Sequence, residues 1–252
     1  MKNELIIKYF PVNFQGKKMK SFRNKIKYVV GIFSILFLSG CAMSPPQPEV
    51  SLNTDVLSRD DIKIGIYYEA PEDKATTHIW GANCLLCYAF ASALTSGLDS
   101  HLESTISTDE LDAIKDLVHS QYSSRFANVK LVQLSTPLDD FKDFDDQLGF
   151  ADKDLRDVKS ELDIDVLVVV QLWSHGAYRS FSDYVPNGDP KGHLAGLLYS
   201  VDLNTNAYLQ YLSINERVQP GGPWDEPPSY PNVTTAYYQA VENVKAKIAK
   251  SF

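Results

Sequence analysis

Apolar and polar residues alternate along the chain after residue 60 in a pattern that predicts several β-strands. We expect strands at residues 62–68, 129–134, 165–173, 193–202 and 207–217. Residues 165–173 form an almost continuous apolar run, which indicates a strand buried on both faces. Asn204 and Asn206 tolerate the left-handed backbone of a tight turn, so the last two strands are predicted to form a hairpin.

Helical spacing of apolar residues separates most of these strands. We expect helices at residues 80–103, 111–122, 154–162 and 234–250. The resulting order, β-α-α-β-α-β-β-α, places crossover helices before a final hairpin. This order predicts an α/β fold with a single domain, in which helices pack on a mixed β-sheet.

The net charge of −8 combines two unlike parts of the chain. Residues 1–41 hold eight basic residues and one acid, so the remaining 16 basic and 31 acidic residues leave residues 42–252 at −15. An acidic body argues against nucleic acid as a partner, because phosphate binding requires clustered Lys and Arg. It also argues against electrostatic docking on anionic lipid.

The basic amino terminus precedes an apolar run at residues 28–38, which is shorter than the roughly 20 residues of a transmembrane helix. Such an arrangement is typical of a secretory signal. Residues 38–41, LSGC, then resemble the lipobox of bacterial lipoproteins. The resemblance implies cleavage before Cys41 and acylation of this residue, which anchors the protein in a membrane. Because Ala42 follows instead of Asp, it also implies localisation at the periplasmic face of the outer membrane.

These features divide the chain into three parts. We expect a lipoprotein signal peptide at residues 1–40, a lipidated Cys and tether at residues 41–59, and a periplasmic α/β domain at residues 60–252. The residues before Met19 are unusual for a signal, whereas Met19 opens a conventional one, so Met19 is an alternative start of the protein.

The other two cysteines, Cys84 and Cys87, allow four interpretations. Helical spacing places both on a buried stripe, as thiols or as a disulfide if Asn83 caps the helix and sets the pair in its first turn. C-x-x-C at a helix start is also found in thiol oxidoreductases. Residues 84–91 resemble the segment around the catalytic Cys of papain-like peptidases, but the Gly-Ser of that segment is Leu-Leu here. A zinc site would need further Cys or His at ligand spacing.

Aromatic residues gather near two loops, at residues 179–192 and 219–232, that are candidate binding surfaces. The candidate residues are Tyr178, Tyr184, Trp224, Asp225 and Tyr230. Tyr and Trp are frequent in binding surfaces because they combine a large apolar area with a polar group. The alternative interpretation is that these rings pin long loops onto the sheet.

The remaining polar residues form no recognisable catalytic motif. His175 and His193 are expected to face each other across adjacent strands, where a structural role is the usual one. Asp143 and Asp145 lie in an acidic segment but lack the spacing of an EF-hand. We therefore predict no catalytic residue, no metal site and no cofactor.

The order of elements resembles a group of envelope proteins. Their fold is that of the amino-terminal domain of the Tol-system β-propeller protein and of curli-secretion-type accessory lipoproteins. The resemblance rests on residues 62–68, 129–134, 163–170 and 201–205. Residues 81–88, 176–180 and 224–238 also resemble segments of proteobacterial lipoproteins of uncharacterised function. The resemblance implies a fold and a place in the cell envelope, but no activity.

Together these features predict an outer-membrane lipoprotein, anchored through Cys41, that acts as a non-enzymatic accessory or assembly factor and binds another envelope protein. Two alternatives remain open. One is a thiol-dependent enzyme, redox or papain-like, that uses Cys84 and Cys87. The other is a binder of a small ligand or glycan through the aromatic loops.

Overall fold

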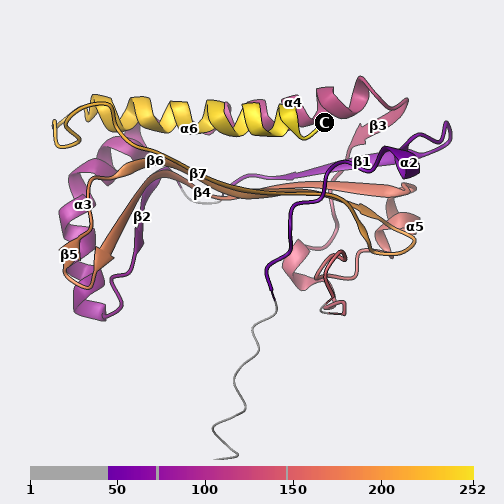
Figure 1. Cartoon of the computed structure of the whole chain (residues 1–252), viewed down its shortest axis with the longest axis horizontal. Coiled ribbons are helices and arrows are strands. Elements are labelled where there is room, and N and C mark those ends of the chain that lie inside the picture. Colours follow the sequence, from indigo (N-terminus) through magenta and orange to yellow (C-terminus); the bar gives the residue numbers. More distant parts are fainter. Residues whose placement is uncertain (1–44, 72–73, 146) are drawn as a thin grey trace, which may run out of the picture. The chain divides into compact units, whose positions relative to one another are not determined.

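One long strand, β4 (Val166–Ser182), organises a seven-stranded mixed sheet (Figure 1). Along one edge β4 pairs in parallel first with β1 (Lys63–Glu69) and then with β2 (Thr76–Trp80). Along its other edge it pairs antiparallel with β6 (Lys191–Asp202). The computed structural model that shows this arrangement describes residues 45–71, 74–145 and 147–252, and Cys41 lies outside these ranges.

The sheet continues outward from these central strands. β7 (Tyr208–Val218) pairs antiparallel with β6, and β3 (Asn128–Leu131) pairs in parallel with β1. The short β5 (Val185–Pro186) forms a hairpin with the end of β4. Residues 46–252 form one compact unit. The predicted fold class, a single α/β domain with a mixed sheet, is confirmed.

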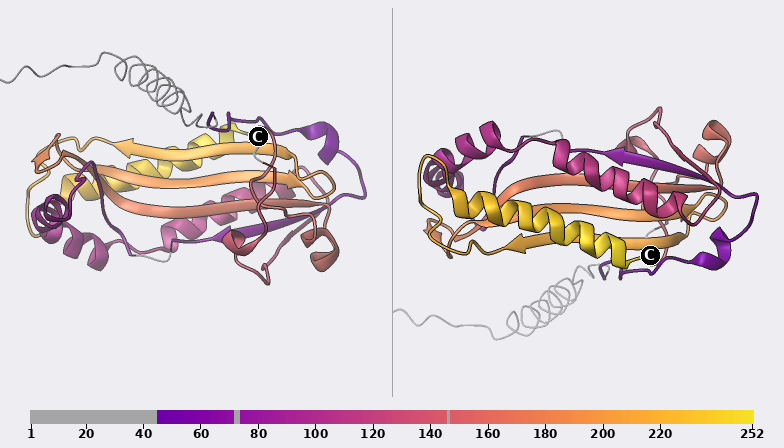
Figure 2. Two further views of the ribbon diagram at one scale, coloured as in Figure 1. Left: turned by 90° about the horizontal axis from the view of Figure 1, so that it is seen from below. Right: turned by 90° about the horizontal axis from the view of Figure 1, so that it is seen from above.

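Helices cover one face of the sheet completely and the other face only in part (Figure 2). On the first, which we call the helix face, lie α4 (Asp109–Ser123), α6 (Pro231–Lys250) and the second half of α3 (Leu85–Thr105). On the opposite or open face, α5 (Val158–Leu162), η1 (Leu138–Asp140) and neighbouring loops form a smaller core over one half of the sheet. No helix in the described ranges is long and apolar enough to span a membrane.

The structure places two elements differently from the sequence-based prediction. The chain forms β2 where a loop and the first turn of a helix were expected, and the Thr77 amide donates to Asp99 Oδ1 of α3 at 2.7 Å. β4 was predicted to end at Trp173. Instead it passes through a β-bulge at Trp173, between Leu172 and Ser174, and continues for another nine residues to Ser182.

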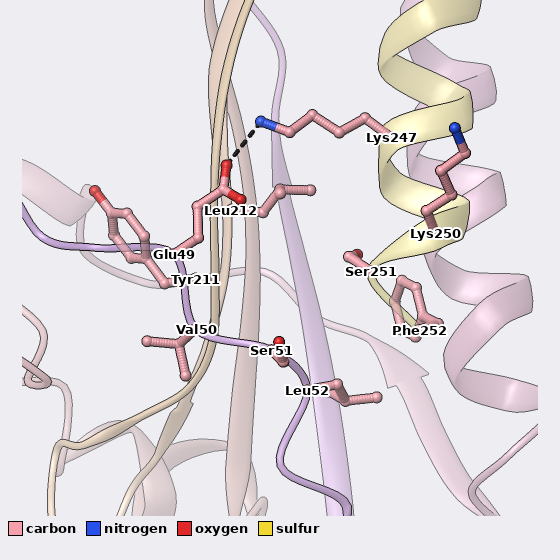
Figure 3. Close-up of a pocket in the computed structure, with 10 residues that line it drawn as sticks. All are labelled: Glu49, Val50, Ser51, Leu52, Tyr211, Leu212, Lys247, Lys250, Ser251 and Phe252. Carbon is pink, nitrogen blue, oxygen red and sulfur yellow. Dashed lines mark hydrogen bonds and ion pairs between the residues drawn. The ribbon is translucent and has the colours of Figure 1, made fainter.

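The carboxyl-terminal part of the predicted tether, from residue 46 onward, belongs to the domain. Val50 exchanges two backbone hydrogen bonds with Tyr211 at the edge of β7, each 2.9 Å long, and the short helix α2 (Thr54–Leu57) follows. Figure 3 shows this segment beside the end of α6, where Glu49 pairs with Lys247 at 2.8 Å and a groove of about 450 Å³ remains. The predicted domain boundary at residue 60 is therefore too late.

The contact between β6 and α6 is close enough to require glycine. A Cβ at Gly192 would overlap backbone atoms of Ala236 and Tyr237 in α6. We expect Gly192→Ala to lower the free energy of unfolding by about 1–3 kcal/mol or more, because the helix must shift away from the sheet. Urea unfolding measures this loss. Gly221→Ala is the matched control, since a Cβ there meets no atom within 4 Å, and equal stability of the two variants would contradict this packing.

Candidate functional site

A cluster of polar rings lies on the uncovered half of the open face. His78, Tyr178, His193 and Arg217 come from four different strands, and we call them the ring cluster. The His78 ring lies 5.9 Å from both the Tyr178 and the His193 ring centroids, and Tyr178 lies 5.7 Å from His193. The Arg217 guanidinium lies 3.5 Å from the Tyr178 ring centroid. Residues distant in the chain thus form one compact polar surface.

Strand register explains why these four residues meet. His78 of β2 is the direct partner of Tyr178 in β4, and His193 of β6 is the direct partner of Arg217 in β7. The partner of His193 in β4 is Gly176, where a Cβ would meet the backbone of Thr76 in β2. Side chains on directly opposed residues point to the same face of a sheet.

The bulge at Trp173 decides which face Tyr178 occupies. Before the bulge, even-numbered residues of β4 such as Val170 and Leu172 contribute to the core of the helix face. After it, the odd-numbered Ala177 does so, and Tyr178 turns to the open face. A bulge adds one residue to a strand and so exchanges its two faces. Without this extra residue the ring cluster would lose its central member.

Burial and positive charge keep the histidines of the cluster neutral. His193 is only 2% exposed, and its Nδ1–H donates to the Glu216 carbonyl oxygen at 3.1 Å, which leaves Nε2 as a hydrogen-bond acceptor. Burial, with smaller contributions from His78, Arg217 and His175, lowers the pKa of His193 to about 4. Burial and Arg217 also lower the pKa of His78. Arg217 is therefore the charged member of the cluster near neutral pH.

Two exposed tryptophans flank the ring cluster. Trp80 at the end of β2 is 64% exposed and Trp173 at the bulge is 54% exposed. Both line a pocket of about 190 Å³, and a second pocket of about 390 Å³ shares His78 and Trp173 in its wall. The other residues of the smaller pocket are His78, Ser174, His193, Ala195, Ser213, Ile214, Asn215 and Arg217. The open face therefore offers aromatic surfaces beside hydrogen-bonding groups.

A second unusual surface lies on the first half of α3. Leu86, Phe90 and Leu94 are all exposed and follow one another at a spacing of four residues, so they form one stripe, the α3 apolar face. From residue 75 to residue 98 the chain contains no Asp, Glu, Lys or Arg. Soluble proteins rarely leave a contiguous apolar helix face uncovered unless it binds something.

Cys84 and Cys87 form a disulfide at the start of α3. Cys84 is the N-cap of the helix and its Sγ accepts from the Cys87 amide at 2.9 Å. The expected buried pair is thus half correct, because Cys87 is 2% exposed whereas Cys84 is exposed. The exposed Leu85 lies between them, and the Tyr184 hydroxyl lies 3.6 Å from Cys84 Sγ. The disulfide holds the first turn of α3 in position.

The predicted aromatic binding residues separate into different environments. Tyr178 belongs to the ring cluster, and Tyr184 packs edge-on against Phe90 of the α3 apolar face. Trp224 is half-buried against the core with the Arg179 guanidinium 4.6 Å from its ring, and Tyr230 is buried. The exposed Asp225 joins neither surface. The second loop is therefore pinned to the sheet, and its residues do not form a common site with the first.

The predicted arrangement of two histidines changes once the structure is known. His175 and His193 lie on adjacent strands but on opposite faces, since His175 Nδ1 lies 3.2 Å from the Tyr237 hydroxyl of α6. The predicted arrangement of these histidines is wrong because of the bulge. Asp143 pairs with Lys153 at 2.7 Å, and the described residues contain no group of three His, Cys, Asp or Glu suited to a metal ion.

The depressed pKa of His193 predicts a measurable pH dependence of stability. An unfolded His takes up a proton near pH 6.5, whereas folded His193 does so only near pH 4. The stabilising contribution of neutral His193 is complete above about pH 6.5 and is lost as the pH falls from there to about 4. We expect the free energy of unfolding of the wild type to fall by roughly 2–3 kcal/mol more between pH 7 and pH 4.5 than that of His193→Gln.

Urea unfolding of both proteins at the two pH values provides this comparison. The carboxylates contribute equally to both proteins and cancel in the difference. The same acid-induced loss in wild type and His193→Gln would contradict the burial of a neutral His193 beside His78, Tyr178 and Arg217.

Comparison with known proteins assigns no role to these surfaces. No protein-family model matches the sequence, and no curated protein matches it either. The geometry of the ring cluster and of the α3 apolar face is therefore the basis on which a function is proposed.

Proposed function

We propose that this protein is a lipid-anchored accessory protein of the bacterial outer membrane that binds another envelope protein through the α3 apolar face. The observation that carries this proposal is the uncovered stripe of Leu86, Phe90 and Leu94. Burial of side chains of this size contributes up to roughly 3 kcal/mol each. A partner that covers the stripe would thus gain a substantial part of its binding energy there.

The lipid anchor of this proposal rests on residues 38–41 and on the basic leader before them. The domain begins at Pro46, so only a few residues separate it from Cys41. An extended chain of five residues spans at most roughly 17 Å. An acylated Cys41 would keep the domain close to the membrane, within reach of partners embedded in or attached to it.

The shape of the apolar surface favours a protein partner with a groove. Apolar side chains at intervals of four residues along one helix face are the pattern by which amphipathic helices enter hydrophobic grooves. Tyr184 widens this surface, and the disulfide at Cys84 fixes the end of the helix that presents it. The net charge of −15 on residues 42–252 opposes adsorption to anionic lipid, which makes a lipid surface the less suitable occupant.

The anchor can be tested by labelling cells with a fatty acid. We expect radioactive palmitate to enter the wild-type protein and to be absent from Cys41→Ser, which would no longer fractionate with the outer membrane. Ala42→Asp should keep the label but shift the protein toward the inner membrane. Equal labelling of the wild type and Cys41→Ser would contradict acylation at this residue.

Docking through α3 can be tested by photo-crosslinking in living cells. A photoreactive residue in place of Phe90 should give one discrete protein adduct, whereas the same residue in place of Ser104 should give none. Ser104 is a suitable control because it is exposed on the same helix but lies outside the apolar face. Leu86→Ser combined with Leu94→Ser should abolish the adduct without lowering the free energy of unfolding, since both side chains are exposed.

Three results would contradict the docking proposal. The first is adduct formation from position 104 as readily as from position 90. The second is an adduct that survives the Leu86→Ser and Leu94→Ser substitutions. The third is crosslinking of position 90 to phospholipid alone, which would make the membrane the occupant of this face.

A further inference from the structure

We propose that the ring cluster and its two flanking tryptophans form a binding site for a carboxylate-bearing sugar. This site lies on the open face of the sheet and is built from β2, β4, β6 and β7 (Figure 2, left). It is separate from the α3 apolar face, so it does not depend on the docking proposal. The inference rests on the charge, the aromatic surfaces and the hydrogen-bonding groups of one pocket.

Arg217 supplies the preference for an anion. Its guanidinium lies over the Tyr178 ring, and among the described residues no carboxylate pairs with it. Stacking on an aromatic ring holds a guanidinium in place while its N–H groups remain available. An Arg fork binds a carboxylate with two parallel hydrogen bonds, which gives both strength and orientation.

Trp80 and Trp173 supply apolar surfaces for a ring. Exposed aromatic side chains beside a pocket are typical of ligand sites, in which a few polar groups fix the orientation of the ligand. The C–H groups on one side of a pyranose form a flat apolar patch that fits against an indole ring. The pocket of about 190 Å³ is smaller than the roughly 300–1,000 Å³ of sites for drug-sized ligands, so it suits a single ring.

The remaining groups of the pocket match the hydroxyls of a sugar. His193 is held by the Glu216 carbonyl so that its Nε2 can accept a hydrogen bond. Ser213 and Asn215 precede Arg217 at alternate positions of β7, and all three line the pocket. Alternate residues of a strand share a face, so a donor, an amide and a guanidinium follow one another along it. The hydroxyls of one sugar ring could form hydrogen bonds with several of these side chains.

The geometry argues against larger anionic ligands. A nucleic acid needs several cations along its backbone, whereas Arg217 is the charged group of this pocket and the surrounding body is strongly acidic. A single carboxylate requires only one Arg. An acidic sugar therefore fits both the charge and the size of the site.

Isothermal titration of the mature lipidated protein in detergent tests this inference with two matched pairs of probes. Glucuronate is compared with glucose, and N-acetylmuramate with N-acetylglucosamine, because the members of each pair differ mainly in a carboxylate. We expect at least one acidic sugar to bind about tenfold or more tightly than its neutral partner, as one charge-assisted contact provides. The two pairs distinguish a uronic acid polysaccharide from a peptidoglycan-type amino sugar as the source.

Variants assign the binding to the proposed residues. Arg217→Met should lose about tenfold or more of the affinity for the acidic sugar and leave the weak affinity for the neutral sugar unchanged. Lys250→Met removes an exposed charge from the end of α6, on the helix face, and should change neither. Trp173→Ala should weaken binding of both sugars, because the ring surface is lost. Circular dichroism confirms that each variant is folded.

Several outcomes would overturn the proposal. Equal affinity for acidic and neutral sugars would show that Arg217 does not bind the carboxylate. Acetate that binds as tightly as the acidic sugars would show that the site takes a bare anion. Failure of all four sugars to bind, or a loss with Lys250→Met equal to that with Arg217→Met, would exclude this pocket as a sugar site.

Discussion

The rest of the structure depends on the pairing of β4 with the strands on its two edges. β4 pairs with β1 and then with β2 along one edge, and with β6 along the other. The position of β4 therefore sets the positions of the strands around it. The bulge at Trp173 lies between the segments that β1 and β2 occupy. It lets the first half of β4 serve two cores and the second half present Tyr178 to the open face. A strand without this irregularity would give a different surface.

The same arrangement explains why the two candidate surfaces lie where they do. Beyond the bulge, no helix of the described residues lies over the open face, and the ring cluster takes the place of an apolar core. β2 is tied to α3 through Asp99, which accepts from the Thr77 amide and from the Thr95 hydroxyl at 2.9 Å. α3 buries the face that carries Cys87, Ala91 and Leu98, which leaves Leu86 and Phe90 uncovered on another face. Both surfaces result from the pairing of β2 with β4 on the same edge as β1.

The spacing of apolar residues along the sequence predicted the elements that have a regular pattern of buried side chains. The apolar patterns of β1, β6, β7 and α6 identified these elements to within a few residues, because the apolar side chains of each are buried against the sheet or its cores. The left-handed Asn206 in the final hairpin was also predictable from residue type, and it has a φ of 66°. The fold class follows from the order of such elements, and each element can be recognised from its own stretch of sequence.

The rest could not be read from periodicity, for physical reasons that individual residues show. Trp173 ends an apolar run, and nothing in the sequence tells a strand end from a bulge. Trp80, Tyr88 and Leu94 have the spacing of a buried helical stripe, but they are exposed. Trp80 belongs to β2, and α3 instead buries the face that carries Cys87 and Ala91. Tyr178, His78, His193 and Arg217 are separated by up to 139 positions, and only strand register brings them together. The candidate site is thus a property of the tertiary structure.

The central claim is that the bulge turns Tyr178 and His193 to the same face and His175 to the other. Nuclear Overhauser contacts between selectively labelled His and Tyr rings in the folded domain test this claim most directly. We expect contacts of His193 with Tyr178 and His78, whose ring centroids lie 5.7 and 5.9 Å away, and contacts of His175 with Tyr237. Contacts between His193 and Tyr237, with none between His193 and Tyr178, would contradict the account.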